Sequence, residues 1–281
     1  MKLTRLGRPI DQEYFPNVLI VVVTIITIAS GSVYYVIAGE QVTFVVLYGF
    51  AMGIAVFLGW AISREIDPDN DFSAFVQMPF TIWGMLYYGV PNIFVMLFLL
   101  HMLRIITRSS GYHATWFESI VWFLFGATLV LIEDYVAGIA MAGAFILDGT
   151  LRNPLRRHLY FGVASVIWVA VMVFMKGHFL IMQSISTWEI ISAGIITIAF
   201  IPVIIGSGAP VSMVDTEEER CDGSRIRASQ LLLLLTAIAY MVLVGKEGLQ
   251  YNYPLWTILL GVSGYWYYKK FFKKTPIDGR A

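Results

Sequence analysis

Long apolar runs are the feature that most constrains the fold of this chain. A helix needs about 20 predominantly apolar residues to cross the hydrocarbon core of a bilayer. Charged residues make up only 14% of the 281 residues, whereas a soluble domain has about 25%. The sequence therefore predicts an all-α polytopic transmembrane bundle that forms a single domain over residues 1–281. Seven segments approach or exceed spanning length: 15–37, 43–62, 79–103, 158–175, 187–207, 229–245 and 254–268.

The first apolar run is expected to be a transmembrane helix rather than a cleaved signal peptide. Polar residues precede it, and no small-residue cleavage site follows a short apolar core. The 19 basic and 19 acidic residues cancel, which argues against a nucleic-acid-binding protein with a basic surface. Cys221 is the only cysteine, so a disulfide within the chain and a cysteine-rich metal site are both excluded.

The number of helices depends on the stretch 115–149. Thr115 and Glu118 fit a capping box at its start, and Gly149 fits a helix C-terminus at its end. Only Glu133 and Asp134 interrupt the apolar residues between them. One continuous helix over this stretch gives eight helices. Two spans split at the acidic pair give nine, but the second would have only 13 residues, 135–147, which is too short to cross unaided.

The distribution of basic residues favours eight helices with both termini in the cytoplasm of a cell (inner) membrane, because cytoplasmic segments are enriched in Lys and Arg. This path puts fifteen basic residues in the cytoplasm and four on the far side, and the nine-helix path gives at best thirteen against six. The four are Arg104, Arg108, Lys176 and Lys246. The expected cytoplasmic segments are the loops 63–78, 149–157 and 208–228 and the basic tail 269–281.

The acidic pair leads to the first functional hypothesis. In a continuous helix Glu133 and Asp134 lie near the middle of the membrane, where a carboxylate must be paired, protonated or bound to a cation. Asn92 follows a helix interruption at Gly89-Val90-Pro91, and broken helices can expose carbonyl groups to ions. The sequence predicts a secondary transporter or ion-conducting protein with Glu133, Asp134 and Asn92 as its ion or proton site. The alternative places the pair in a water-exposed loop between two shorter segments.

The cytoplasmic loops lead to a second hypothesis. Asp67, Asp69 and Asp71 lie within one acidic loop, and oxygen-rich loops of this type can hold Mg²⁺, which then bridges a diphosphate. Arginine guanidinium groups match phosphate oxygens, and the candidates here are Arg156, Arg225 and Arg227. The alternative function is therefore a Mg²⁺-dependent membrane enzyme that acts on a lipid-linked or prenyl diphosphate. Turn formation and a solvated basic loop explain the same residues without a ligand.

A short resemblance accompanies this second hypothesis. Arg64-Glu65-Ile66-Asp67 with Asn70, and Asp222-Gly223-Ser224-Arg225, resemble the paired Asp-rich loops of the UbiA prenyltransferases over about a dozen residues. That resemblance implies Mg²⁺ and a prenyl diphosphate as ligands. The sequence departs from the family where its leading Asn-Asp pair would fall, at Gly59-Trp60, and in the spacing of the aspartates. The chain is therefore not assigned to that family.

A third hypothesis is a structural subunit of a larger membrane complex. The four histidines, His101, His113, His158 and His178, have none of the spacings typical of zinc, di-iron or haem sites. Beyond Mg²⁺ no cofactor is predicted. The expected partners are the lipid bilayer and a small ion or solute, or a lipid-linked substrate, and a homo-oligomer or a membrane complex stays open.

Overall fold

The computed structural model describes residues 5–8, 11–176, 184–216 and 219–272, and within these ranges the secondary structure consists of helices, with one isolated β-bridge between Met213 and Arg220. The helices are α1 (Phe15–Ile37), α2 (Val42–Ile66), α3 (Ser73–Val76), α4 (Met78–Tyr88), α5 (Ile93–Thr107), α6 (Trp116–Leu131), α7 (Tyr135–Thr150), α8 (Arg157–Lys176), α9 (Thr187–Gly206), α10 (Gly223–Ala239), the π-helix η1 (Tyr240–Val244) and α11 (Lys246–Phe271).

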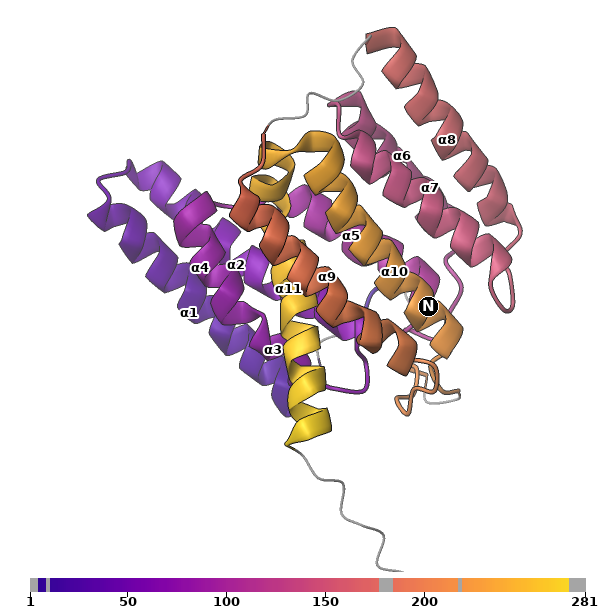
Figure 1. Cartoon of the computed structure of the whole chain (residues 1–281), viewed down its shortest axis with the longest axis horizontal. Coiled ribbons are helices and arrows are strands. Elements are labelled where there is room, and N and C mark those ends of the chain that lie inside the picture. The colour runs from indigo at the N-terminus through magenta and orange to yellow at the C-terminus, as the bar shows by residue number, and fades with distance from the viewer. Residues whose placement is uncertain (1–4, 9–10, 177–183, 217–218, 273–281) are drawn as a thin grey trace, which may run out of the picture.

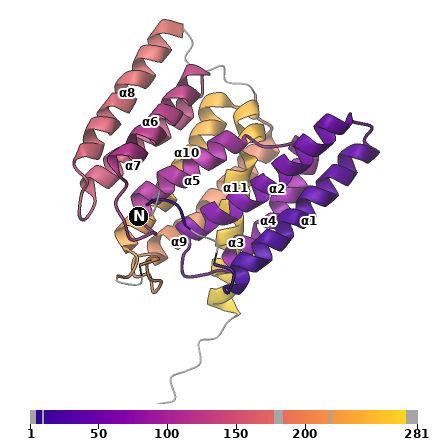
Figure 2. The ribbon, with the colours of Figure 1, turned by 180° about the vertical axis from the view of Figure 1, so that it is seen from behind.

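Successive helices run in opposite directions between two faces of the molecule (Figures 1 and 2). Along the described residues the chain makes ten such passages, counting α3 with α4 and η1 with α10. Contacts between helix ends fix the two faces. Glu65 at the end of α2 meets Arg104 and Thr107 at the end of α5. We call the face that carries these ends the basic face, and α1 begins and α11 ends on it.

The predicted helix 79–103 is wrong, because the chain reverses direction inside it. α4 ends at Tyr88, Gly89 adopts a positive φ of 85°, and α5 begins at Ile93. Pro91 disfavours the helical conformation of the residue before it, and the Asn92 side chain caps α5 by accepting a hydrogen bond from the Val95 amide at 3.2 Å. The interruption is therefore a turn between two short helices rather than a kink within one span.

The predicted continuous helix over 115–149 is also wrong. The capping box of Thr115 and Glu118 is confirmed at the start of α6, but α6 ends at Leu131 and α7 begins at Tyr135. Glu133 has a positive φ of 71° in the connecting turn, and Asp134 caps α7. Because α6 and α7 pack against one another as a hairpin, the acidic pair lies in a turn at the opposite face and not inside a helix.

Several helices have the length and composition of membrane spans, which is consistent with an integral membrane protein. Five segments are long and apolar enough: α1, α2, α8, α9 and Gly223–Val244, which joins α10 to η1. The helices α5, α6 and α7 are apolar but shorter, with 15, 16 and 16 residues. The predicted eight-helix path is thus replaced by ten passages, several of them short.

The observed path separates the basic residues between the two faces more completely than the predicted path does. Arg104 and Arg108, expected on the far side, lie on the basic face because α5 runs toward it. Among the described residues only Lys176 and Lys246 lie at helix ends on the opposite face. The other thirteen described basic residues lie on the basic face: Arg5, Arg8, Arg64, Arg104, Arg108, Arg152, Arg156, Arg157, Arg220, Arg225, Arg227, Lys269 and Lys270. The predicted contributions of Lys2, Lys273, Lys274 and Arg280 fall outside the described residues.

Burial distinguishes central from peripheral helices. The core is formed mainly by side chains of α2, α5, α7, α10 and α11. α1, α8 and α9 are peripheral, and large apolar side chains such as Ile25, Phe174 and Ile198 are 60–89% exposed on them. Exposed apolar surface of this extent on long helices is what contact with lipid requires.

Candidate functional site

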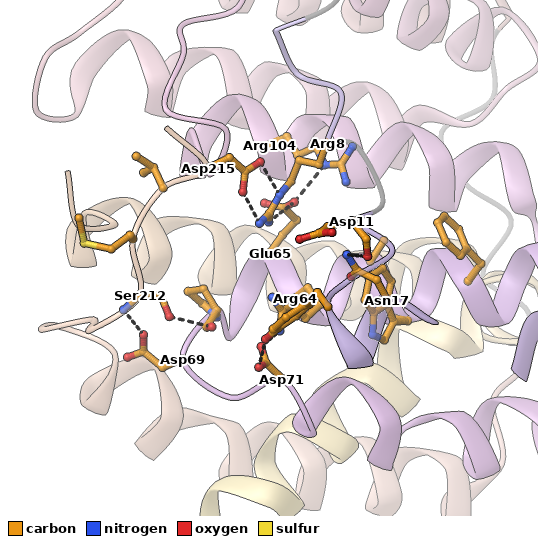
Figure 3. Close-up of a pocket in the computed structure, with 17 residues that line it drawn as sticks. Arg8, Asp11, Asn17, Arg64, Glu65, Asp69, Asp71, Arg104, Ser212 and Asp215 are labelled. Atoms are coloured by element: carbon orange, nitrogen blue, oxygen red, sulfur yellow. Dashed lines mark hydrogen bonds and ion pairs between the residues drawn. The ribbon is translucent and has the colours of Figure 1, made fainter. Parts of the chain in front are cut away.

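A polar pocket of about 600 Å³ opens on the basic face, between the N-terminal segment, α1, α2 and two loops. Figure 3 shows its charged side chains converging from segments far apart in the sequence. Helix α2 contributes Phe57, Trp60 and Ala61 deeper along its length, whereas the charged residues lie nearer its end. The polar lining residues are Arg8, Asp11, Tyr14, Asn17, Arg64, Glu65, Asp69, Asp71, Arg104, Ser212 and Asp215.

Glu65 is the most deeply placed charge of this pocket, and its side chain has no exposed surface. Its Oε1 accepts hydrogen bonds from Arg104 Nε at 3.0 Å and from an Arg8 terminal nitrogen at 3.4 Å, and its Oε2 accepts one from the Thr107 hydroxyl at 3.1 Å. A buried carboxylate must be paired and hydrogen-bonded to be tolerated. Glu65 therefore fixes the ends of α2 and α5 and the N-terminal segment relative to one another.

The arginines of the pocket are held by carboxylates from other segments. Arg8 donates two hydrogen bonds to Asp215, at 2.9 and 2.6 Å. Burial lowers the pKa of Arg8, but the nearby carboxylates of Glu65 and Asp215 outweigh it and raise the pKa above its ordinary value. Arg64 pairs with Asp71, which also accepts a hydrogen bond from Tyr14. The guanidinium groups are thus oriented without a ligand.

The three predicted metal ligands lie in one loop but do not converge. Asp69 accepts hydrogen bonds from the amides of Val211 and Ser212, at 3.0 and 2.7 Å, and Asp71 faces Arg64. Asp67 is buried at the end of α2 and accepts a hydrogen bond from Asn70 at 2.7 Å. Burial raises the pKa of Asp67 to about 6. Over the described ranges no group of three His, Cys, Asp or Glu residues is arranged to hold a metal ion.

The predicted phosphate ligands are not brought together either. Arg225 is buried and donates to Asp148 at 2.7 Å and to carbonyl oxygens of Ile106 and Arg152. Arg227 donates to the carbonyl of Ile205, and Arg156 is exposed. The arginines that do line the pocket are Arg8, Arg64 and Arg104. Sequence reasoning missed Arg104 because it placed the end of α5 on the wrong face.

The predicted ion site is divided between two turns of the opposite face. Glu133 is half exposed and pairs with Lys176 at 3.0 Å. Both Asp134 oxygens lie 2.9 Å from the Tyr240 hydroxyl, which donates to them. The Asn92 side chain caps α5 in the α4–α5 turn, and its backbone N–H donates to the carbonyl of Tyr251 at 2.9 Å. These contacts give each residue a structural role.

The composition of the pocket indicates which ligands it suits. Three guanidinium groups face five carboxylates, those of Asp11, Glu65, Asp69, Asp71 and Asp215. The lining is therefore net negative, although most of the described Lys and Arg residues lie on the face around it. Aromatic side chains attract cations through their ring faces, and Tyr14, Phe57 and Trp60 line the same hollow. Charge and apolar surface together favour a cation with an apolar portion.

The chain matches no protein-family model, and neither the curated proteins nor the solved structures contain a significant match to it. The resemblance to UbiA prenyltransferases thus gains no support from these comparisons.

Proposed function

We propose that this protein is an integral membrane transporter that binds an amphiphilic organic cation in the pocket of its basic face. The observation that carries the proposal is the pocket itself. Its carboxylates outnumber its arginines, and Phe57 and Trp60 provide an apolar surface beside them. A bound ammonium group next to these carboxylates and aromatic rings gains electrostatic and cation–π stabilisation.

Two features of the helices support transport rather than simple binding. The helix that begins with α10 passes into the π-helix η1, and α11 is broken at Asn252, whose φ and ψ are −123° and 21°, just before Pro254. Interrupted helices are common in transporters, where they line the substrate path and allow movement. A second polar hollow of about 320 Å³, lined by Tyr88, Glu189 and Lys246 among others, opens on the opposite face.

The acidic pair Glu133 and Asp134 is not part of this proposal. Its expected role depended on a position inside one continuous helix, whereas Glu133 has a positive φ and Asp134 caps α7. The transport hypothesis from the sequence is therefore kept, with its binding site moved to the basic face. That face is proposed to be cytoplasmic, because it carries nearly all the described basic residues.

A Mg²⁺-dependent enzyme acting on a lipid-linked diphosphate is the second candidate. Asp69 and Asp71 share the pocket with Arg8, Arg64 and Arg104, so a metal-bound diphosphate would find both carboxylates and guanidinium groups within one hollow. The apolar residues of α2 would then face the lipid chain. This candidate requires Asp69 and Asp71 to leave their present partners in order to bind the metal.

Ligand binding to the purified full chain tests the two candidates. The probes are an alkyltrimethylammonium ion and a prenyl diphosphate with Mg²⁺, and the readouts are thermal unfolding and equilibrium dialysis. We expect saturable binding of the ammonium ion and its uptake into proteoliposomes. Asp11→Asn removes one carboxylate of the lining and should weaken binding about three- to tenfold at low salt, since one charge is lost. Glu13→Gln is the matched control, because Glu13 does not line the pocket.

The outcomes separate the candidates. Binding of the diphosphate that requires Mg²⁺, without binding of the ammonium ion, would replace the transporter by the enzyme. Binding of neither probe would contradict both. Ammonium binding that Asp11→Asn and Glu13→Gln weaken equally would contradict the assignment to this pocket.

A further inference from the structure

One organic cation already lies in the basic-face pocket, and it belongs to the chain itself. The Arg8 side chain reaches into the pocket from the N-terminal segment (Figure 3). Its Nε and one terminal nitrogen donate to the two oxygens of Asp215 at 2.9 and 2.6 Å, and its other terminal nitrogen donates to Glu65 Oε1 at 3.4 Å. We call the two carboxylates of Asp215 and Glu65 the cation position, because together they hold this planar cation.

Both carboxylates are held in place without Arg8. The backbone N–H of Asp215 donates to the carbonyl of Ser109, just beyond α5, at 3.0 Å. Glu65 also accepts a hydrogen bond from Arg104 Nε at 3.0 Å. The cation position is therefore expected to persist when the Arg8 side chain moves away.

The N-terminal segment is anchored by contacts that do not involve the Arg8 side chain. The backbone N–H groups of Arg5 and Leu6 donate to Glu118 Oε1 at 2.6 and 3.0 Å. The Leu6 side chain is buried, and its carbonyl accepts a hydrogen bond from Arg104 at 3.3 Å. Arg8 lies two residues beyond this anchor, so its guanidinium group can leave the cation position and still remain close to it. A tethered group of this kind competes with a free ligand at a high effective concentration.

Solvent reaches the Arg8 contact, in contrast to the deeply buried ion pairs of this face. The side chains of Arg8 and Asp215 are 24% and 27% exposed, whereas those of Arg225 and Asp148 are 4% and 1% exposed. Ion pairs that solvent reaches contribute little to folding stability. The Arg8 contact also lines a pocket of about 600 Å³, so an incoming cation can approach the same carboxylates.

We infer that Arg8 is an internal occupant of the cation position, and that a ligand displaces it in order to bind there. The inference rests on the function proposed above and adds its regulation. The fraction of molecules in which Arg8 has left the cation position sets the apparent affinity for the ligand.

The contacts of Arg8 also indicate the class of ligand. A guanidinium group carries N–H donors in a planar fork, which can replace the three contacts that Arg8 makes, whereas a quaternary ammonium ion has no N–H donor. Alkylguanidinium ions should therefore bind more tightly than alkyltrimethylammonium ions with the same alkyl chain.

A small guanidinium probe tests the cation position directly. In the full chain with Arg8→Ala, methylguanidinium chloride should raise the thermal unfolding temperature in a saturable way, because it refills the vacated position. Tetramethylammonium chloride at the same concentration should raise it less, and the wild type should gain no such stabilisation. Adding Asp215→Asn to Arg8→Ala should abolish the effect. Arg5→Ala is the matched control, since Arg5 lies in the same segment but does not line the pocket.

Displacement is tested with the amphiphilic cations. Arg8→Lys keeps the positive charge but loses the bidentate contact with Asp215. It should bind an alkylguanidinium ion and the alkyltrimethylammonium ion about three- to tenfold more tightly than the wild type does. Because the charge is unchanged, a change in local potential would not explain this result. Arg8→Gln should bind both ions more tightly still, and Arg5→Gln should bind them like the wild type.

Equal affinity of the wild type and of folded Arg8→Lys and Arg8→Gln for both ions would overturn displacement. Equal stabilisation of the wild type and Arg8→Ala by methylguanidinium would overturn the cation position, and Arg8→Gln replaces Arg8→Ala in that measurement if the latter does not fold. Stabilisation of Arg8→Ala by methylguanidinium, without binding of either amphiphilic cation to any variant, would contradict the proposed function and leave Arg8 as the occupant of the cation position.

Discussion

Each of two deeply buried carboxylates on the basic face is held by two arginines. Glu65 lies between Arg8 and Arg104. Asp148 accepts from Arg108 Nε at 2.8 Å and from Arg225 at 2.7 Å, and it also lies 2.8 Å from His158 Nδ1. These groups connect α2, α5, α7, α8 and α10 near one face. Pairs of this kind are costly to break because the remaining charge stays buried.

Asp148→Asn should therefore lower the free energy of unfolding by about 3–5 kcal/mol, since two guanidinium groups lose their counterion. Glu133→Gln is the contrast, because Glu133 and Lys176 are both about half exposed and such pairs contribute about 0–1 kcal/mol. Thermal and denaturant unfolding in detergent measure the stability of both variants. Equal destabilisation by the two substitutions would contradict this account of Asp148.

Asp67 should make stability depend on pH. Its pKa is raised from about 4 to about 6 by burial, so folding favours the neutral form more than the unfolded chain does. This contribution is complete below pH 4 and is lost as the pH rises through 6. We expect Asp67→Asn to raise the free energy of unfolding at pH 8 by about 1–3 kcal/mol and to flatten its dependence between pH 4 and 7. The exposed control Glu40→Gln should leave that dependence unchanged.

At the scale of helices, the sequence predicted those elements whose ends carry specific side-chain signals. The capping box at Thr115 and Glu118 was recognisable, and long apolar runs located α1, α2, α8 and α9 correctly. The chain reversals at the α4–α5 and α6–α7 turns were not predicted, because apolar residues continue on both sides of each turn. Positive φ angles at Gly89 and Glu133 accompany the two reversals, and hydropathy does not reveal a backbone angle.

The contact of α2, α4 and α11 around Gln77 gives a prediction for one element. Gly261→Ala should destabilise the protein by about 1–3 kcal/mol, because the new methyl group would meet the Gln77 backbone and Cβ at 2.6–2.8 Å. Gly264→Ala lies one turn further along α11 with open space around it, and should be neutral or stabilising by up to about 1 kcal/mol. Unfolding of the two variants side by side is the measurement. A smaller effect at Gly261 than at Gly264 would contradict the close approach.

For the whole molecule, the fold class was predictable and the pocket was not. The acidic loop was recognised, but Arg8 and Asp215, which bond to each other in the same pocket, are separated by 207 residues in the sequence. The two residues come together only if the ten passages return the chain near Asp215 to the same face as Arg8. The incorrect path through Pro91 placed Arg104 and Arg108 on the wrong side, which separated Arg104 from Arg8 and Arg64, the other arginines of the pocket.

Cysteine labelling tests the ten-passage path. The Ile132 side chain, in the α6–α7 turn, is 68% exposed. A cysteine introduced by Ile132→Cys should therefore react with a membrane-impermeant maleimide from outside intact cells. Asn153→Cys, in the α7–α8 turn on the basic face, should react only after the membrane is opened. Both variants are made in a chain that carries Cys221→Ser, so that the introduced cysteine is the single thiol. The native Cys221 thiol would react little in any case, because burial raises its pKa to about 11. An unreactive cysteine at 132 would favour the continuous helix.

The unequal division of basic residues between the faces also limits how copies of the chain can assemble. Inverting one molecule in a bilayer would carry thirteen described cationic side chains across hydrocarbon, each at a cost of about 2.5–3.5 kcal/mol. Cytoplasmic enrichment of Lys and Arg is what sets orientation at insertion, so we expect neighbouring copies to be parallel. A symmetric homo-oligomer of parallel copies would have its rotation axis along the membrane normal.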